Sequence, residues 1–206
     1  MRRPESVKAL ETLGRTRLSP SFFMREFLYS EIANLHGLSN IPDDPDLAIE
    51  VGRKLCEELL EPLNATFGRV AIRSSYRSCL VNQFGNENKL GCARNEANYA
   101  GHIWDKRDAE GLTGAMACIV LPWFTDRYQQ GTDWRALAYW IHDHLPYSSL
   151  EFFPSDGLCA FNIGWHEKPK KIIHNYIPPA CKLINGDASP SDQAMLYADF
   201  PLLRQK

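Results

Sequence analysis

The sequence predicts an α+β protein in which helices pack on a small, mainly antiparallel sheet. Two observations lead to this class. Apolar residues recur at helical spacing in the first third of the chain, and the last third contains short apolar runs separated by Pro, Gly, Asp and Lys, as in antiparallel strands. With 206 residues, of which 44% are hydrophobic and 11% aromatic, the chain is long enough for one domain with a substantial core.

Two helices are expected before the first strand. The first is expected to begin at Ser19, which can cap it, with Pro20 at the first helical position, and to end at Gly37. The second is expected to run from Asp44, as its cap, to about Asn64. Its apolar residues recur at steps of three and four positions and form one stripe: Ala48, Val51, Leu55, Leu59 and Leu63.

A buried strand is expected over residues 70–72, where an apolar run follows Gly68. Small polar residues end this strand and present Tyr76 and Arg77, and a short turn of helix is expected after them. The planar guanidinium group of Arg77 suits a carboxylate or a phosphate. From spacing alone, the role expected for Arg77 is to tie neighbouring loops together by binding their backbone carbonyls, because loop arginines outnumber ligand arginines.

Residues 83–114 are polar and rich in Asn. A stretch of this length without periodicity is usually either functional or disordered, and the embedded Tyr99 and Trp104 argue against disorder. We therefore expect an ordered loop over a site. A second central strand is expected over residues 115–121, and it is expected to break at the proline that follows.

The last third begins with a helix that is capped by Thr132 and ends near His144. Three antiparallel strands are expected after it, over residues 150–153, 160–165 and 172–176. The run His142-Asp143-His144 looks like a pair of metal ligands. However, residues two apart on a helix point away from each other, so a structural role is expected for it.

The sequence is divided into an N-terminal arm of residues 1–18, a domain of residues 19–178 and a C-terminal tail of residues 179–206. The arm is charged and weakly patterned, and the tail contains Pro, Asp and Ser. An end of this kind often gains order from a partner. An oligomer or assembly formed through the tail is therefore one alternative.

Composition argues against several functional classes. The net charge of −2 creates no field that would attract nucleic acid. No stretch approaches the roughly 18 apolar residues that a membrane span needs, and the arginines near the start precede no apolar segment, so neither a span nor a secretory signal is expected. The protein is thus expected to be made in the cytoplasm. Six scattered cysteines without a C-x-x-C pair argue against a zinc ribbon or a disulfide framework.

Three stretches together resemble a known family. RVAIRSSYRSCLVN, from Arg69 to Asn82, FFMREF and LLEPLNATFG are similar to segments of the zinc D-Ala-D-Ala carboxypeptidase family, which has the Hedgehog/DD-peptidase fold. The resemblance covers about residues 20–177. In that family the arginine of an S-G-Y-R-S motif helps to hold the substrate, so the resemblance implies that Arg77 contacts a ligand. Ser75 stands where the motif has glycine.

The resemblance does not extend to the zinc ligands. The family binds zinc through H-x-x-G-x-A-x-D and through a histidine in a late strand. Here Gly111 stands at the first histidine position, Cys118 at the aspartate position and Asn162 at the second histidine position. A catalytic zinc ion needs three protein ligands and an open position for water. The resemblance therefore implies a metal-free, non-catalytic module without a cofactor.

An alternative retains zinc by means of relocated ligands. His102 lies upstream of the second strand, and together with Cys118 and His166 it would make a chemically sensible triad. However, His166 lies four residues from Asn162, which is roughly 13 Å along a strand. In this alternative the protein is a zinc-dependent peptidoglycan carboxypeptidase or endopeptidase.

Six residues are expected to contact a ligand, and none is expected to be catalytic or to bind metal: Arg77, Tyr76, Asn82, His102, Asp105 and Asn162. The resemblance implies a peptidoglycan peptide as the ligand or other virion proteins as partners, in a phage or prophage virion component or a cell-wall-binding protein. The absence of a secretory signal would also suit a lysis protein that a holin releases. A cytoplasmic protein with an unrelated small ligand is a third alternative.

Overall fold

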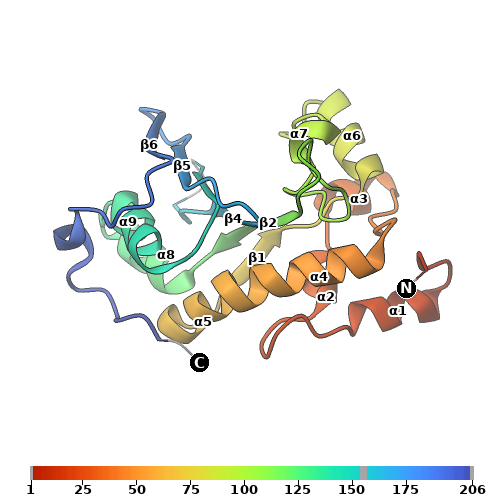
Figure 1. Cartoon of the computed structure of the whole chain (residues 1–206), viewed down its shortest axis with the longest axis horizontal. Helices are drawn as coiled ribbons and strands as arrows, with labels where there is room; N and C mark the ends of the chain where they lie inside the picture. The colour runs from red at the N-terminus through yellow and green to blue at the C-terminus, as the bar shows by residue number, and fades with distance from the viewer. Residues whose placement is uncertain (1, 154–156, 205–206) are drawn as a thin grey trace. The chain divides into compact units, whose positions relative to one another are not determined.

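The computed structural model describes residues 2–153 and 157–204 and contains both helices and strands (Figure 1), which confirms the predicted α+β class. Contacts within the chain divide it into two compact units. The first comprises Met1–Glu57 and Ser74–Ala117, and the second comprises Glu58–Arg73 and Cys118–Lys206. The second unit therefore includes residues on both sides of the expected boundary at residue 178.

The first unit is mainly helical. Its helices are α1 (Val7–Gly14), α2 (Met24–Phe27), α3 (Glu31–His36), α4 (Pro45–Leu55), α6 (Cys79–Glu87) and α7 (Asn95–Asn98). Helix α1 lies in the residues that were expected to form a peripheral arm. The side chain of Ser6 caps this helix, and Leu13 and Leu18 are buried. The arm thus contributes to the core of its unit.

The single helix expected from Ser19 to Gly37 is wrong, because the structure has two short helices there. Ser30 begins α3 by accepting a hydrogen bond from the backbone of Ala33 at 3.3 Å. Helix α2 has a separate start at Phe23, whose backbone N–H donates to the Glu26 carboxylate at 2.7 Å. Two capping signals within one apolar stretch divide it. Gly37 ends α3 in the left-handed conformation, as predicted.

The long helix that follows is confirmed. It consists of α4, a π-helical turn at Cys56–Leu60 and α5 (Glu61–Phe67). The Asp44 side chain caps α4 by accepting from the backbone of Leu47 at 3.1 Å. The π turn lies next to Pro62, which has no N–H to continue the hydrogen-bond ladder. The chain passes from the first unit into the second within this helical segment, between Glu57 and Glu58.

A six-stranded, mostly antiparallel sheet has the strand order β1-β2-β4-β3-β5-β6. The strands are β1 (Ala71–Ser74), β2 (Gly114–Val120), β3 (Ser149–Phe152), β4 (Phe161–His166), β5 (Ile172–Asn175) and β6 (Cys181–Asn185). Strand β3 is antiparallel to β4, as predicted, but parallel to β5, where an antiparallel strand was expected. After β4 the chain reverses and crosses to the other side of β3, so β5 must run in the direction of β3.

Not every element of the second unit was expected from the sequence. Helix α8 (Pro122–Gln129) begins where the chain was expected only to break, because Pro122 occupies the first helical turn. Helix α9 (Trp134–His144) is confirmed, although its cap is Asp133 and not Thr132. Strand β6 and a 3-10 helix (Ala194–Tyr197) lie in the expected tail.

An aromatic cluster fixes the end of the chain within the second unit. Phe200 is buried, and its ring centroid lies 5.1 Å from that of Trp123 and 6.1 Å from that of Phe67. The indole N–H of Trp140 donates to the backbone carbonyl of Pro201 at 3.2 Å. Phe200 and Pro201, which lie in the residues expected to form a tail for a partner, therefore pack on their own unit.

Among the described residues, no helix is both long enough and apolar enough to cross a membrane.

Substitution of a buried residue in the long helix tests the packing of the core. Leu55 is fully buried, whereas Leu35 of α3 is 81% exposed. Replacing Leu55 with Ala should lower the free energy of unfolding by about 2–5 kcal/mol, because a cavity is left behind. Leu35→Ala is the matched control and should change it by less than about 0.5 kcal/mol. Urea denaturation measures both, and equal effects would contradict the assigned packing.

Candidate functional site

The segment that follows β1 is held by one buried side chain, Asn40. Its amide group donates to the backbone carbonyls of Leu28 at 3.0 Å and Tyr76 at 2.9 Å. Its carbonyl oxygen accepts from the backbone N–H of Ser78 at 2.7 Å. Arg77 lies between two of these residues, so Asn40 fixes the backbone from which the Arg77 side chain extends. No sequence pattern marks Asn40, because its partners are far from it along the chain.

Arg77 itself is half-buried and contacts neutral groups. Its Nη1 atom lies 3.3 Å from Oδ1 of Asn82 and 2.9 Å from Sγ of Cys92. Its backbone N–H donates to the carbonyl of His102 at 2.8 Å. Among the described residues, none provides a carboxylate within ion-pair distance of this guanidinium group. Its positive charge is therefore not neutralised within the described part of the chain.

A small cavity lies beside Arg77. Its volume is about 200 Å³. The residues that line it include Tyr29, Glu31, Ser75, Arg77, Leu90 and Cys92. Glu31 is exposed, so the cavity combines one half-buried cation with one acidic group that remains in contact with water.

Asn82 is fully buried and orients Arg77. Its amide donates to the carbonyl of Ala93 at 3.0 Å and to Oδ1 of Asn95 at 2.9 Å. Its oxygen accepts from Asn98 at 3.0 Å and from Arg77. A side-chain amide has two donors and two acceptor positions, so all its hydrogen-bonding capacity is used within the protein. Asn82 therefore supports the site and has no free group for a ligand.

His102 is a buried, neutral imidazole. Its Nδ1 lies 2.8 Å from the backbone carbonyl of Ser75, so Nδ1 carries the proton and donates. Burial lowers the pKa of His102 to about 3, and the positive charge of Arg77 contributes in the same direction. His102 thus adds no charge to the site at neutral pH.

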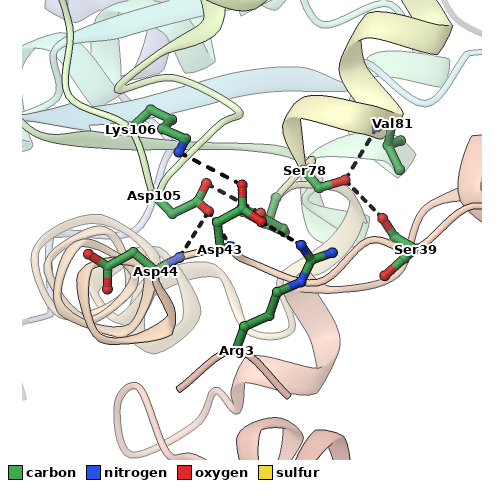
Figure 2. Close-up of polar contacts among 9 residues, drawn as sticks. Arg3, Ser39, Asp43, Asp44, Ser78, Val81, Asp105 and Lys106 are labelled. Atoms are coloured by element: carbon green, nitrogen blue, oxygen red, sulfur yellow. Dashed lines mark hydrogen bonds and ion pairs between the residues drawn. The ribbon is translucent and has the colours of Figure 1, made fainter. Parts of the chain in front are cut away.

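Asp105 is a buried carboxylate with several donors (Figure 2). One oxygen accepts from the backbone N–H groups of Asp43 at 2.7 Å and Asp44 at 3.4 Å, and the other accepts from the Tyr76 hydroxyl at 3.3 Å. Burial raises the pKa of Asp105, and the backbone hydrogen bonds oppose this increase. Arg3 and Lys106 face the Asp43 side chain instead. Tyr76 and Asp105 therefore join the start of α4 to the segment after β1.

Five of the six predicted site residues thus form one connected network within the first unit. The sixth, Asn162, lies on β4 of the second unit. Its amide donates to the carboxylate of its register partner Glu151 at 2.8 Å.

The residues at the three zinc positions do not fit a zinc ion. Gly111 has no side chain to offer, Asn162 is an amide already bonded to Glu151, and Cys118 is a single thiol. An amide is a poor zinc ligand, and one thiolate does not hold the ion. In the part of the chain that the structure describes, no group of three or more His, Cys, Asp or Glu side chains is arranged to hold a metal. Of the relocated set, His102 belongs to the first unit, whereas Cys118 and His166 belong to the second.

The run from His142 to His144 has a structural role, as expected. His142 is bonded to the Tyr147 hydroxyl at 2.8 Å and to the carbonyl of Ser189 at 2.9 Å. The Asp143 carboxylate accepts from the hydroxyl of Ser191 at 2.7 Å. These contacts hold the segment after β6 against α9.

The structure therefore defines an α+β protein in which a buried polar network presents one arginine to a small cavity. Comparison with protein-family models gives no match, and neither curated proteins nor solved structures match the chain significantly.

The buried imidazole predicts a pH dependence of stability. The pKa of His102 in the folded protein, about 3, lies below its ordinary value of 6.5, so the unfolded chain binds an extra proton between these values. Stability from this group is present above pH 6.5 and is lost as the pH falls toward 3, with a slope of up to about 1.4 kcal/mol per pH unit. His102→Asn retains a donor for Ser75 and should flatten that slope. Unfolding measured across this pH range in the unchanged chain and in His102→Asn tests this dependence, and equal slopes in the two proteins would contradict it.

Loss of the Asn40 side chain should weaken the whole first unit. Asn40→Ala leaves three backbone groups without their partner, which should cost on the order of 3 kcal/mol. Asn34→Ala, at an exposed position of α3, is the control and should cost less than about 0.5 kcal/mol. Thermal and urea unfolding would show the difference, and similar losses in both variants would remove the role given to Asn40.

Proposed function

We propose that this chain is a metal-free, non-catalytic binding module of the Hedgehog/DD-peptidase fold that holds the carboxylate of a peptidoglycan peptide at Arg77. The observation that supports this proposal is the uncompensated guanidinium group beside the cavity of about 200 Å³. The resemblance of the surrounding sequence to the D-Ala-D-Ala carboxypeptidases gives the ligand class.

The hydrogen bonds of Arg77 leave part of its guanidinium group available. Both described side-chain contacts are made by Nη1. A guanidinium group has five N–H donors, and two parallel donors suit the two oxygens of a carboxylate. Within the described residues, Nη2 and Nε have no partner. They form the pair that would bind the ligand carboxylate.

The positive charge of Arg77 favours binding of an anion at the cavity. His102 is neutral because its pKa is far below 7, and Arg77 contacts only an amide oxygen and a thiol. A bound carboxylate would therefore neutralise a charge that is partly removed from water, which makes the pair stronger than an exposed one. Glu31 at the rim acts in the opposite direction by repelling an anion.

The residues at the three expected zinc positions support binding without hydrolysis. The three positions that would hold the catalytic ion are glycine, thiol and amide, and none of the other described side chains is arranged to replace them. The proposed biological setting is a phage or prophage virion component or a cell-wall-binding protein. This setting rests on the family resemblance alone.

Substitution of Arg77 tests the binding site. With a muramyl peptide that ends in D-Ala-D-Ala, Arg77→Gln should weaken binding by about 10- to 100-fold, the value expected for charge-assisted hydrogen bonds. Arg77→Lys should recover only part of the affinity, because an ammonium group cannot bind in a bidentate manner. Isothermal titration calorimetry measures each affinity.

Two further variants serve as controls for the effect of substituting Arg77. Arg107→Gln removes an exposed arginine whose Nη1 binds only the carbonyl of Gly111, and affinity should not change. Glu31→Gln removes a repelling charge and should increase affinity. Equal affinity of Arg77→Gln and the unchanged chain would refute the carboxylate site.

The same protein should contain no stoichiometric zinc by elemental analysis and should release no D-Ala from muropeptides. About one zinc per chain that is lost in Cys118→Ser, together with release of D-Ala, would instead establish the zinc-dependent carboxypeptidase or endopeptidase with relocated ligands.

A further inference from the structure

A large cavity belongs entirely to the second unit. Its volume is about 750 Å³, which is within the usual range for ligand pockets, about 300–1,000 Å³. The end of α8, the start of α9, the loop after β5 and strand β6 provide its described walls. The cavity is therefore large enough for a small organic ligand.

Buried contacts hold the walls of this cavity in place. The amide group of Asn175, which is 2% exposed, donates to the backbone carbonyls of Ile177 at 2.6 Å and Pro179 at 3.2 Å. Its oxygen accepts from the backbone N–H of Ile177 at 2.7 Å. The ring of Trp134 packs on the buried ring of Phe152, with the centroids 4.9 Å apart. Because these walls are already ordered, a ligand would not have to order them on binding.

The apolar side of the cavity includes residues of the loop after β5 and of β6. Ile177 and Pro178 line it from the loop. Leu183 lines it from β6, where it is the extra residue of an irregular register between Lys182 and Ile184. A bulge of this kind redirects a side chain away from the regular alternation of a strand. This side of the cavity therefore offers apolar surface but no charge.

The charged side chains among the described lining residues are Asp133 and Arg135, and they neutralise each other. Nε of Arg135 donates to both carboxylate oxygens of Asp133, at 3.0 and 2.9 Å. The same carboxylate accepts from the backbone N–H of Arg135 at 2.9 Å, at the start of α9. An anion would have to compete with Asp133 for the guanidinium group, and a cation would have to compete with Arg135. The cavity therefore favours a neutral ligand.

Three neutral polar groups at the cavity have no hydrogen-bond partner among the described residues. They are the hydroxyl of Tyr128, the amide of Gln129 and the indole N–H of Trp134. A purely apolar ligand would separate these groups from water without replacing their hydrogen bonds, which is costly. The ligand must therefore offer hydroxyl or carbonyl groups as well as apolar surface.

We propose that this cavity binds a neutral oligosaccharide made of pyranose rings with equatorial substituents. Such a ring has two flat C–H faces and a rim of hydroxyl groups. The C–H faces suit the aromatic rings of Tyr128 and Trp134 and the apolar side of the cavity. The hydroxyl groups can bond to the three unpartnered polar groups, and no ionic group is needed.

Isothermal titration calorimetry of the full chain with two neutral trisaccharides tests the proposal. The probes are cellotriose, made of β-linked glucose, and chitotriose, made of β-linked N-acetylglucosamine. At least one of them should bind saturably. The de-N-acetylated form of chitotriose has the same rings with ammonium groups and should bind at least tenfold more weakly than chitotriose if chitotriose is the ligand, because the cavity has no free acid to pair with them. Adenosine, a flat neutral heterocycle, should bind more weakly than the better trisaccharide.

Conservative variants locate the site without removing a ring from the core. Tyr128→Phe, Trp134→Phe and Gln129→Met each remove one hydrogen-bonding group and should weaken binding of the better trisaccharide by about 3- to 10-fold. Gln130→Met makes the same change at the next, exposed residue, which does not line the cavity. Tyr29→Phe removes an exposed hydroxyl in the first unit. Neither control should alter the affinity.

Three results would overturn the proposal. The first is the absence of saturable binding of both trisaccharides. The second is unchanged affinity in all three cavity variants, which would place any bound sugar elsewhere. The third is tighter binding of adenosine than of either trisaccharide, which would assign the cavity to a nucleobase. Arg77→Gln should leave sugar binding unchanged, because Arg77 belongs to the first unit, so failure here and failure of the carboxylate site are distinguishable.

Discussion

The first unit depends on the side chain of Asn40, which serves as a hydrogen-bond partner for three separate backbone groups. Two carbonyls and one N–H group meet at this single buried amide. Buried backbone groups without partners are costly, so the segment after β1 cannot shift independently of the segments around Leu28 and Asn40. The direction of Arg77 is therefore set by a residue far earlier in the chain. A neighbouring amide, Asn82, completes this constraint from the side of α6.

Elements with local signals were predictable from the sequence, and elements that depend on distant partners were not. The helix that begins after Asp44 has a cap, a proline in its first turn and a continuous apolar stripe, and the structure contains it. Pro122 gave an ambiguous signal, because proline both ends strands and starts helices. The parallel pairing of β5 with β3 is decided by strand order, which no local pattern specifies. The packing of Phe200 likewise depends on partners in other elements.

Five residues of the polar network could be selected from the sequence, but Asn40 and the division of roles could not. Tyr76, Arg77, Asn82, His102 and Asp105 were selected as polar residues near one strand, and contacts join them in the structure. Only the three-dimensional structure shows that most of these side chains are bonded within the protein. Cys92 was not selected, although it contacts the guanidinium group, because a lone thiol in a polar loop has no distinguishing spacing. A sequence shows which polar groups are present, whereas burial decides which remain available.

The aromatic cluster of the second unit has an optical consequence. Trp123 contacts Phe200, and the indole of Trp140 is bonded to the backbone just beyond it. Both chromophores therefore sense whether Phe200 and Pro201 are docked. Their emission wavelength and quenching provide an intrinsic reporter for release of this segment, for instance when a partner competes for its place, without attaching any dye.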